Sequence, residues 1–449
     1  MSLSERLKQS SAARASGSGD VGQTVDLEIY HQLKSALHAR VVDRLDLESL
    51  QQLSPELLKQ EIGNLLGSMV AEGNMPLNRR EREQMVQELL DEILGLGPLE
   101  ALLRDLTISD ILVNTYATVY VERQGRLEPT GLRFRDNDHL QQTINRIVAR
   151  VGRRVDETSP MVDARLPDGS RVNAIIPPLA VDGPILSIRR FGGAPLRIAD
   201  LLQLGAITEP MRAFVDGCVK ARLNILISGG TGTGKTTMLN ALSSFIPSHE
   251  RVITIEDAAE LQLQQTHVVR LETRPANVEG KGEIVTRDLV RNSLRMRPDR
   301  IIVGEIRSVE VIDMLQAMNT GHEGSMATVH ANSPRDALTR MQAMIGMAGL
   351  NITESVVAQM IARALDLIVQ LHRASDGRRR VVSISEVTGT EGNVIQMQDI
   401  FLFRQTGLDG EGRVVGDFVA TGVRPRCMDR LERAGYALPA DVFAPGRKA

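Results

Sequence analysis

A glycine-rich segment at residues 229–237 has the residue types and the spacing to hold a chain of phosphates. It fits the pattern G-x-x-x-x-G-K-[ST]. An apolar stretch at 225–227 precedes it and a helical pattern over 238–245 follows, which is the strand–loop–helix context that such a loop needs. Glycines let several backbone N–H groups approach phosphate oxygens at a helix N-terminus. The predicted phosphate-binding residues are Gly229, Gly230, Thr231, Gly232, Thr233, Gly234, Lys235, Thr236 and Thr237.

Two side chains at the end of this loop are predicted to act directly on a nucleotide. The ammonium of Lys235 is expected to reach the β- and γ-phosphates, and the hydroxyl of Thr236 to bind Mg²⁺. The alternative is a chance glycine- and threonine-rich turn, which the order of strand, motif and helix disfavours.

Two more apolar segments end in acids. Residues 300–304 lead into Glu305, and residues 252–255 lead into Glu256 and Asp257. In a doubly wound sheet the carboxyl ends of the strands face the ligand, so these acids are expected beside the phosphates. Glu305 is predicted to orient or deprotonate a water, and Glu256 and Asp257 to organise Mg²⁺ or water. The alternative is that the acids favour the start of a helix, where negative charge is stabilised.

Two histidines, His322 and His330, lie in a segment that also contains Gly321 and Gly324. A zinc pair usually has closer spacing and further ligands, so zinc is not expected. The glycines favour a loop in which an imidazole senses the terminal phosphate. The alternative for each histidine is a structural role.

Composition limits the classes of function. With 53 basic and 56 acidic residues the formal net charge is −3, and aromatic residues are 3% with no Trp, which argues against a nucleic-acid-binding surface. A basic run at Arg378–Arg380 is interpreted as a solvated face. Two cysteines, Cys218 and Cys427, are too few for a four-cysteine zinc site and suit a reducing compartment.

The order of patterns predicts an α/β protein in several parts. Its length of 449 residues exceeds one typical domain. The N-terminus shows no signal-peptide pattern, and no apolar stretch approaches the ~20 residues of a spanning helix, so we expect a cytoplasmic protein. The expected parts are a flexible tail (1–25), a module with helical apolar spacing (26–95), an α/β domain (96–193), and a domain with a largely parallel sheet (194–449) whose last strands, from residue 381, are short and broken by Gly389, Gly392 and Gly410.

The motifs, taken together and in this order, resemble those of the secretion-ATPase superfamily of type II and type IV secretion and type IV pili. The Walker A loop, the acidic box, the Walker B strand end and the histidine box of that family match residues 229–236, 254–257, 303–307 and 320–330. Within the superfamily the sequence is most similar to the CpaF/TadA-like ATPases of Flp (Tad) pilus assembly. The segments that carry this similarity are 97–100, 162–173, 187–191 and 257–304.

The resemblance implies a RecA-like ATPase domain with a C-terminal extension, preceded by a PAS-like α/β domain. It also implies a homo-hexamer that uses ATP and Mg²⁺ to move one domain against the other. Such a motor would power Flp/Tad (type IVb) pilus assembly or type II/IV secretion, docked peripherally on platform proteins of the inner membrane, with membrane contact only through partners and no nucleic acid. The alternatives are a RecA-like DNA-transfer motor of the conjugation type and a small-molecule kinase.

The resemblance also assigns roles to residues. It implies that Glu305 is the general base, that Glu256 organises Mg²⁺ and water, and that His322 is the histidine-box residue, with His330 as the second choice. Arginines of the upstream domain contact phosphates in relatives. The matching candidates here are Arg165, Arg171, Arg189 and Arg190, of which Arg189 and Arg190 are predicted to be catalytic.

The sequence departs from the family at two points. The pilus-extension and type II branches often carry a four-cysteine zinc site, which two cysteines cannot build, so that branch is disfavoured. The family also commonly has Asn-Gly at a strand end where this chain has Asn114-Thr115.

Overall fold

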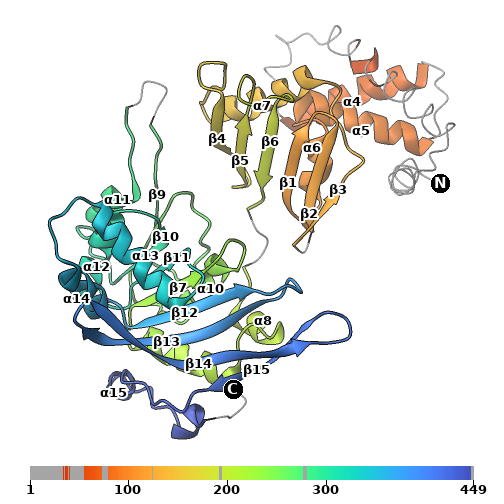
Figure 1. Ribbon diagram of the computed structural model, residues 1–449. Coiled ribbons are helices and arrows are strands. Elements are labelled where there is room, and N and C mark those ends of the chain that lie inside the picture. Colours follow the sequence, from red (N-terminus) through yellow and green to blue (C-terminus); the bar gives the residue numbers. More distant parts are fainter. Residues whose placement is uncertain are drawn as a thin grey trace. The chain divides into compact units, whose positions relative to one another are not determined.

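The computed structural model describes residues 55–72, 79–123, 125–191, 195–276 and 281–445, together with positions 34, 36–38 and 40. The chain forms two units, residues 1–193 and residues 194–449 (Figure 1). The predicted tail at 1–25 lies outside the described residues. The observed architecture is α/β, as the sequence predicts.

The first unit begins with helices. Helices α4 (Pro55–Glu72) and α5 (Arg79–Leu94) pack against each other through apolar side chains at three- and four-residue spacing, and α6 (Leu99–Arg104) follows. Their shared core contains Ile62, Leu66, Met69, Met85 and Leu89.

The rest of the first unit is an antiparallel sheet with the strand order β3-β2-β1-β6-β5-β4. One face packs on α7 (Asn137–Arg150), whose buried residues Leu140, Ile144, Ile147 and Val148 recur at helical spacing. The strands are β1 (Ile108–Thr115), β2 (Thr118–Arg123), β3 (Arg126–Pro129), β4 (Met161–Arg165), β5 (Arg171–Ile175) and β6 (Ile185–Arg189).

The second unit contains a nine-stranded sheet with the order β15-β14-β13-β12-β7-β11-β10-β8-β9. From β12 to β9 all neighbours are parallel, so their carboxyl ends meet at one edge, whereas β13, β14 and β15 are antiparallel. The strands are β7 (Ile225–Gly229), β8 (Val252–Glu256), β9 (Val268–Glu272), β10 (Arg300–Ile306), β11 (Met326–Val329), β12 (Leu367–Arg373), β13 (Arg379–Glu391), β14 (Val394–Leu408) and β15 (Val414–Ala420).

Helices cover both faces of this sheet, which explains its nearly continuous apolar strands. In β7, Ile225 and Ile227 join one hydrophobic cluster and Leu226 joins another on the opposite face. The first cluster includes residues of α8 (Ile198–Gln203), α9 (Glu209–Lys220), α10 (Lys235–Ser243) and α15 (Met428–Arg433). The second includes residues of α11 (Thr286–Ser293), α12 (Glu310–Asn319), α13 (Pro334–Met347) and α14 (Glu354–Ala364) (Figure 1).

The C-terminal strands are longer than the sequence predicts. Strand β13 has 13 residues and β14 has 15. Gly389 does not end β13, because it lies at a register shift within the strand, where its positive φ of 137° is accommodated as an irregularity. Gly392 and Gly410 do lie in turns. The expectation of short, broken strands is therefore wrong for β13 and β14.

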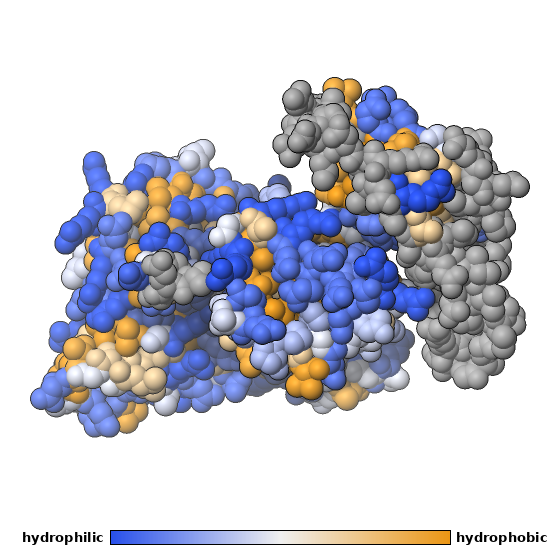
Figure 2. Space-filling model, turned by 90° about the horizontal axis from the view of Figure 1, so that it is seen from above, coloured by the Kyte–Doolittle hydropathy of each residue, from blue (hydrophilic) through white to orange (hydrophobic). Residues whose placement is uncertain are grey.

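The described helices include none that is long and apolar enough to cross a bilayer. The face seen in Figure 2 is mostly hydrophilic, with hydrophobic areas interspersed among charged and polar ones.

Asn224 connects the start of β7 to its neighbours. Its side chain is only 3% exposed, and both the NH₂ group and the carbonyl oxygen of the side-chain amide form two hydrogen bonds each. The amide nitrogen donates to the carbonyls of Met318 (3.3 Å) and Ala364 (2.7 Å), and Oδ1 accepts from the N–H groups of Gly324 (2.9 Å) and Ser325 (3.1 Å). This residue therefore fixes the end of the sheet opposite to the phosphate loop.

We expect Asn224→Ala to lower the free energy of unfolding of the second unit by about 2–4 kcal/mol, because it leaves several buried backbone groups without partners. The measurement is the urea midpoint of the full chain. Asn393→Ala is the control, because Asn393 lies in a turn and donates one long hydrogen bond, of 3.3 Å, to Glu354. Equal midpoints for the two variants would contradict the assigned role.

Candidate functional site

Four segments that carry predicted site residues end at the same edge of the parallel sheet. Strand β7 runs directly into the phosphate loop, and its Ser228 is paired with Val329 of β11. Val329 is paired with Ile306 of β10, next to Glu305, and β8 ends alongside β10 at Glu256. The topology therefore brings the loop and the acids together, as the sequence predicts for a doubly wound sheet.

The phosphate loop has a conformation that requires glycine. Gly232 and Gly234 have φ values of 69° and 92°, in the left-handed region. A Cβ atom on Gly229 would lie 2.5 Å from Oγ1 of Thr233 and 3.0 Å from the carbonyl oxygen of Leu371. The hydroxyl of Thr233 donates to the carbonyl of Gly230 at 2.9 Å, and α10 begins at Lys235. The loop is thus a tight bend at a helix N-terminus.

Lys235 folds back onto this loop. Its ammonium donates to the carbonyl oxygens of Gly229 (3.0 Å) and Gly230 (2.9 Å). Burial lowers the pKa of Lys235, the carboxylate of Glu305 opposes that shift, and the guanidinium groups of Arg307 and Arg340 add to it. Lys235 and Glu305 therefore share one electrostatic environment.

Arg307 joins two of the predicted acids. Its guanidinium donates to Oε2 of Glu305 from Nε (3.0 Å) and Nη2 (2.6 Å), and to Oδ2 of Asp257 from Nη1 (2.7 Å). The other oxygen of Asp257 accepts from the hydroxyl of Thr286 at 3.2 Å. The sequence motifs assign no role to Arg307, which lies just beyond the end of β10, two residues after Glu305.

Glu256 is the most enclosed of the acids, with 5% of its surface exposed. It packs against Gly304, where an added Cβ would lie 2.8 Å from Cγ of Glu256. Its Oε2 accepts from the N–H groups of Glu260 (2.8 Å) and Leu261 (3.0 Å), whereas Oε1 is buried and has no hydrogen-bond partner within the described ranges. Burial raises the pKa of Glu256, and these two hydrogen bonds oppose the shift.

The oxygen atoms at this edge suit Mg²⁺ bound together with phosphates better than a metal ion that is bound by protein side chains alone. Over the described part of the chain, no group of three or more His, Cys, Asp or Glu residues is arranged to hold a metal ion. Mg²⁺ usually keeps several waters and binds one or two protein groups plus substrate phosphates. The hydroxyl of Thr236 and the partnerless Oε1 of Glu256 fit that pattern, whereas Asp257 is already engaged by Arg307 and Thr286.

The two histidines lie at opposite ends of β11. His330 directly follows Val329 and so lies at the edge of the phosphate loop. His322 precedes the strand, and its carbonyl accepts from the hydroxyl of Ser325, which also binds the N–H of Ile301 at the start of β10. Because β11 runs parallel to β7, it carries the chain from the far edge to the loop edge. The structure therefore places His330, and not His322, at the edge of the sheet that carries the phosphate loop.

Three of the four candidate arginines of the first unit form a row across neighbouring strands. Arg165 is paired with Arg171, and Arg171 with Arg189. Directly paired residues project from the same face, which here is opposite to the buried residues of β5 and β6. Arg190 follows one position later, so it projects from the other face, and its guanidinium donates to the carbonyl of Asp105. Arg190 is therefore not part of the row.

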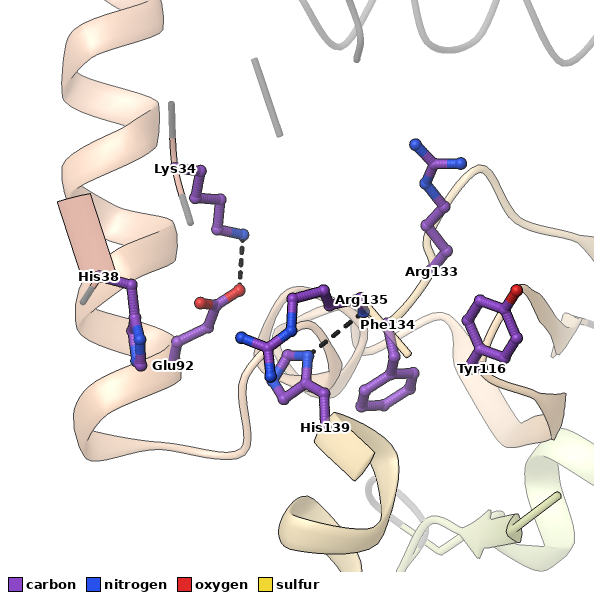
Figure 3. Close-up of a pocket in the computed structure, with 8 residues that line it drawn as sticks. All are labelled: Lys34, His38, Glu92, Tyr116, Arg133, Phe134, Arg135 and His139. Atoms are coloured by element: carbon purple, nitrogen blue, oxygen red, sulfur yellow. Dashed lines mark hydrogen bonds and ion pairs between the residues drawn. The ribbon is translucent and has the colours of Figure 1, made fainter. Parts of the chain in front are cut away.

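A separate cavity of about 300 Å³ lies in the first unit (Figure 3). Lys34 on its wall pairs with Glu88 (3.0 Å) and Glu92 (2.8 Å). Burial is the largest cause that lowers the pKa values of His38 and His139, which favours neutral imidazoles. The lining residues are Lys34, His38, Glu92, Tyr116, Arg133, Phe134, Arg135 and His139, and none belongs to the predicted phosphate site.

Two models of known protein families match the sequence of this chain. A family model described as "Type II/IV secretion system protein" matches residues 92–413. The chain belongs to the type II/IV secretion ATPase superfamily. A second model, described as "Type II secretion system protein E, N-terminal domain", matches residues 30–94. The first match extends from the end of α5 across the boundary at residue 193, so the family relation includes both units.

Individual members of the superfamily are similar over most of their length. A putative conjugal transfer protein of Mycobacterium tuberculosis is 40% identical over 312 residues, which is 68% of this chain and 88% of that protein. The conjugal transfer protein TrbB of Rhizobium radiobacter is 30% identical over 331 residues, 71% of this chain and 95% of its own. The crystal structure of the VirB11 ATPase from the Brucella suis type IV secretion system is 25% identical, with 64% and 94% covered and a TM-score of 0.35.

Proposed function

We propose that the second unit binds ATP with Mg²⁺ at the phosphate loop and hydrolyses it. One observation carries this proposal. The glycine-rich loop, Lys235, Glu305 and Glu256 all lie at one edge of the parallel part of the nine-stranded sheet. Membership of the secretion ATPase superfamily supports the same activity.

When a nucleotide binds, the ammonium of Lys235 changes its hydrogen-bond partners. Its ammonium now donates to two neutral carbonyls, of Gly229 and Gly230. A phosphate oxygen carries negative charge, so it attracts the ammonium more strongly than a neutral carbonyl does, and phosphate oxygens replace these carbonyls. Thr236 and Oε1 of Glu256 would hold Mg²⁺, which when bound supplies positive charge that neutralises the phosphate oxygens.

Glu305 acts as the general base. In the present geometry Arg307 donates two hydrogen bonds to Oε2 of Glu305, which orient the carboxylate. Asp257 anchors the other side of the same guanidinium. For hydrolysis, Glu305 accepts a proton from the attacking water. His330, at the same edge, is positioned to contact the terminal phosphate, in place of His322.

The arginine row of the first unit supplies further positive charge. Arg165, Arg171 and Arg189 project from one face of the sheet, and Asp110 of β1 is paired with Arg189. We propose that this face meets the phosphates when the first unit closes on a bound nucleotide. Charge on the transferring phosphoryl group is stabilised by such cations.

The proposal also covers the fold type of each unit, the oligomeric state and the biological task. A parallel sheet covered on both faces supports a RecA-like core, and an antiparallel sheet with a helix on one face supports a PAS-like domain. We propose a homo-hexamer that works from the cytoplasmic side of the inner membrane with platform proteins. The quoted motifs favour Flp/Tad pilus assembly as its task.

A conjugation-type DNA-transfer motor is the alternative, and the names of the relatives from Mycobacterium tuberculosis and Rhizobium radiobacter favour it. The net charge of −3 and the scarcity of aromatic residues argue against direct DNA binding. Stimulation of ATP hydrolysis by added DNA, in a salt-dependent manner, would favour the alternative.

We expect Glu305→Gln to bind ATP but to hydrolyse it about 100-fold more slowly or worse, because the base is removed while the phosphate loop is intact. Lys235→Ala should lose nucleotide binding instead. The measurements are phosphate release and the affinity for a fluorescent ATP analogue. Glu354→Gln, which changes an exposed acid of α14, is the control. Hydrolysis by Glu305→Gln at the unaltered rate would remove Glu305 from the mechanism.

Substitutions in the arginine row and at Arg190 should have different effects on kcat. Arg189→Ala should lower kcat by about tenfold or more, because it removes a cation from the row. Arg190→Ala should leave kcat per folded molecule close to that of the unaltered chain, because that guanidinium binds Asp105 on the other face. Melting curves establish the folded fraction. A larger loss for Arg190→Ala than for Arg189→Ala would contradict the assignment.

A further inference from the structure

The three consecutive arginines at 378–380 lie in three different environments. Arg378 is exposed in the turn between β12 and β13. Arg380 is 8% exposed, with its guanidinium 5.1 Å from the ring centroid of Phe403. Arg379 reaches the phosphate loop, where its Nε donates to the carbonyl oxygen of Gly232 at 2.9 Å. Arg378 and Arg379 are both exposed, as a solvated face predicts, whereas Arg380 is buried.

The sheet explains how Arg379 reaches a loop that is far away in sequence. Strand β12 is parallel to β7, with Leu371 paired to Gly229. Two residues later Arg373 ends β12, and it is paired with Arg379 at the start of β13. The β12–β13 turn therefore extends from the edge that carries the phosphate loop.

Both arginines of this pair are close to the glycines of the loop. A Cβ atom added to Gly232 would lie 3.5 Å from Nη1 of Arg373, and one added to Gly234 would lie 3.6 Å from Cδ of Arg379. Like charges placed directly opposite each other across two strands are destabilising. No described carboxylate forms an ion pair with Arg379. An anion in the loop would lie close to both positively charged side chains.

The hydrogen bond to Gly232 also fixes the orientation of a backbone N–H. The Gly232–Thr233 peptide is planar and trans, so the N–H of Thr233 points away from the carbonyl that Arg379 holds. Glycine has wide backbone freedom, so the bond from Arg379 restricts this peptide to one orientation. In loops of this kind the N–H groups are the phosphate ligands.

We propose that Arg379 is a positioning residue for the phosphate site: it orients the Gly232–Thr233 peptide so that the N–H of Thr233 faces the phosphates, while the Arg373–Arg379 pair adds positive charge beside them. This inference rests on the proposed function, because it concerns the same nucleotide site. It assigns a role in cis to the β12–β13 hairpin of the second unit. The role is separate from that of the arginine row in the first unit.

The test compares neighbouring arginines that carry the same charge. In the full chain, Arg379→Ala should weaken the binding of both a fluorescent ATP analogue and ADP by about tenfold, the equivalent of about 1.4 kcal/mol. It should raise KM for ATP similarly, with a smaller change in kcat, because the lost contact stabilises ground state and transition state alike. Arg378→Ala removes a charge from the same turn and should stay within about twofold of the unaltered chain.

Two further variants separate the hydrogen bond from the charge. Arg379→Lys keeps a charged donor and Arg379→Gln keeps a neutral one, so each should recover part of the affinity that Arg379→Ala loses. Melting temperatures identify any variant that is simply unfolded. Equal nucleotide affinity in Arg379→Ala and Arg378→Ala, with the unaltered chain active, would overturn this inference alone. Absence of nucleotide binding by the unaltered chain would overturn both this inference and the proposed function.

Discussion

The parallel arrangement of β12, β7, β11, β10 and β8 is the constraint on which the account of this protein depends. Parallel strands place their carboxyl ends at one edge, so short segments from distant parts of the sequence meet there. The phosphate loop, Glu305, Glu256 and Arg379 all reach that edge from different strands. The two hydrophobic clusters hold the sheet from both faces, and the site is built on this rigid support.

Most charged side chains at this edge have hydrogen-bond partners within the protein. Lys235 donates to carbonyls of its own loop, and Arg307 bridges Glu305 and Asp257. Oε1 of Glu256 is the exception, because it is buried and has no hydrogen-bond partner among the described residues. A triphosphate with a divalent cation carries the complementary charges. Binding of a nucleotide would therefore change the hydrogen bonds among these side chains.

Local patterns in the sequence predicted that Lys235 and Glu305 lie at the same edge of the sheet, whereas the positions of the other candidates depend on strand register and direction. Lys235 and Glu305 follow apolar strands within a few residues, so their placement needs only local information. The choice between His322 and His330 depends on the direction of β11, which spacing does not reveal. The row formed by Arg165, Arg171 and Arg189 needs two strand registers, and the contact of Arg379 with Gly232 joins residues 147 positions apart. The sequence predicts too short a strand β13 because Gly389 resembles a break, whereas in the structure it lies at an irregularity within the strand.

The most direct test of the central claim is an experimental structure of the chain with Mg²⁺ and a non-hydrolysable ATP analogue. The account predicts a triphosphate enclosed by residues 229–237, with the Lys235 ammonium moved from the carbonyls of Gly229 and Gly230 onto phosphate oxygens. A nucleotide bound elsewhere, such as in the cavity beside Lys34 and His139, with Lys235 still on those carbonyls, would contradict it.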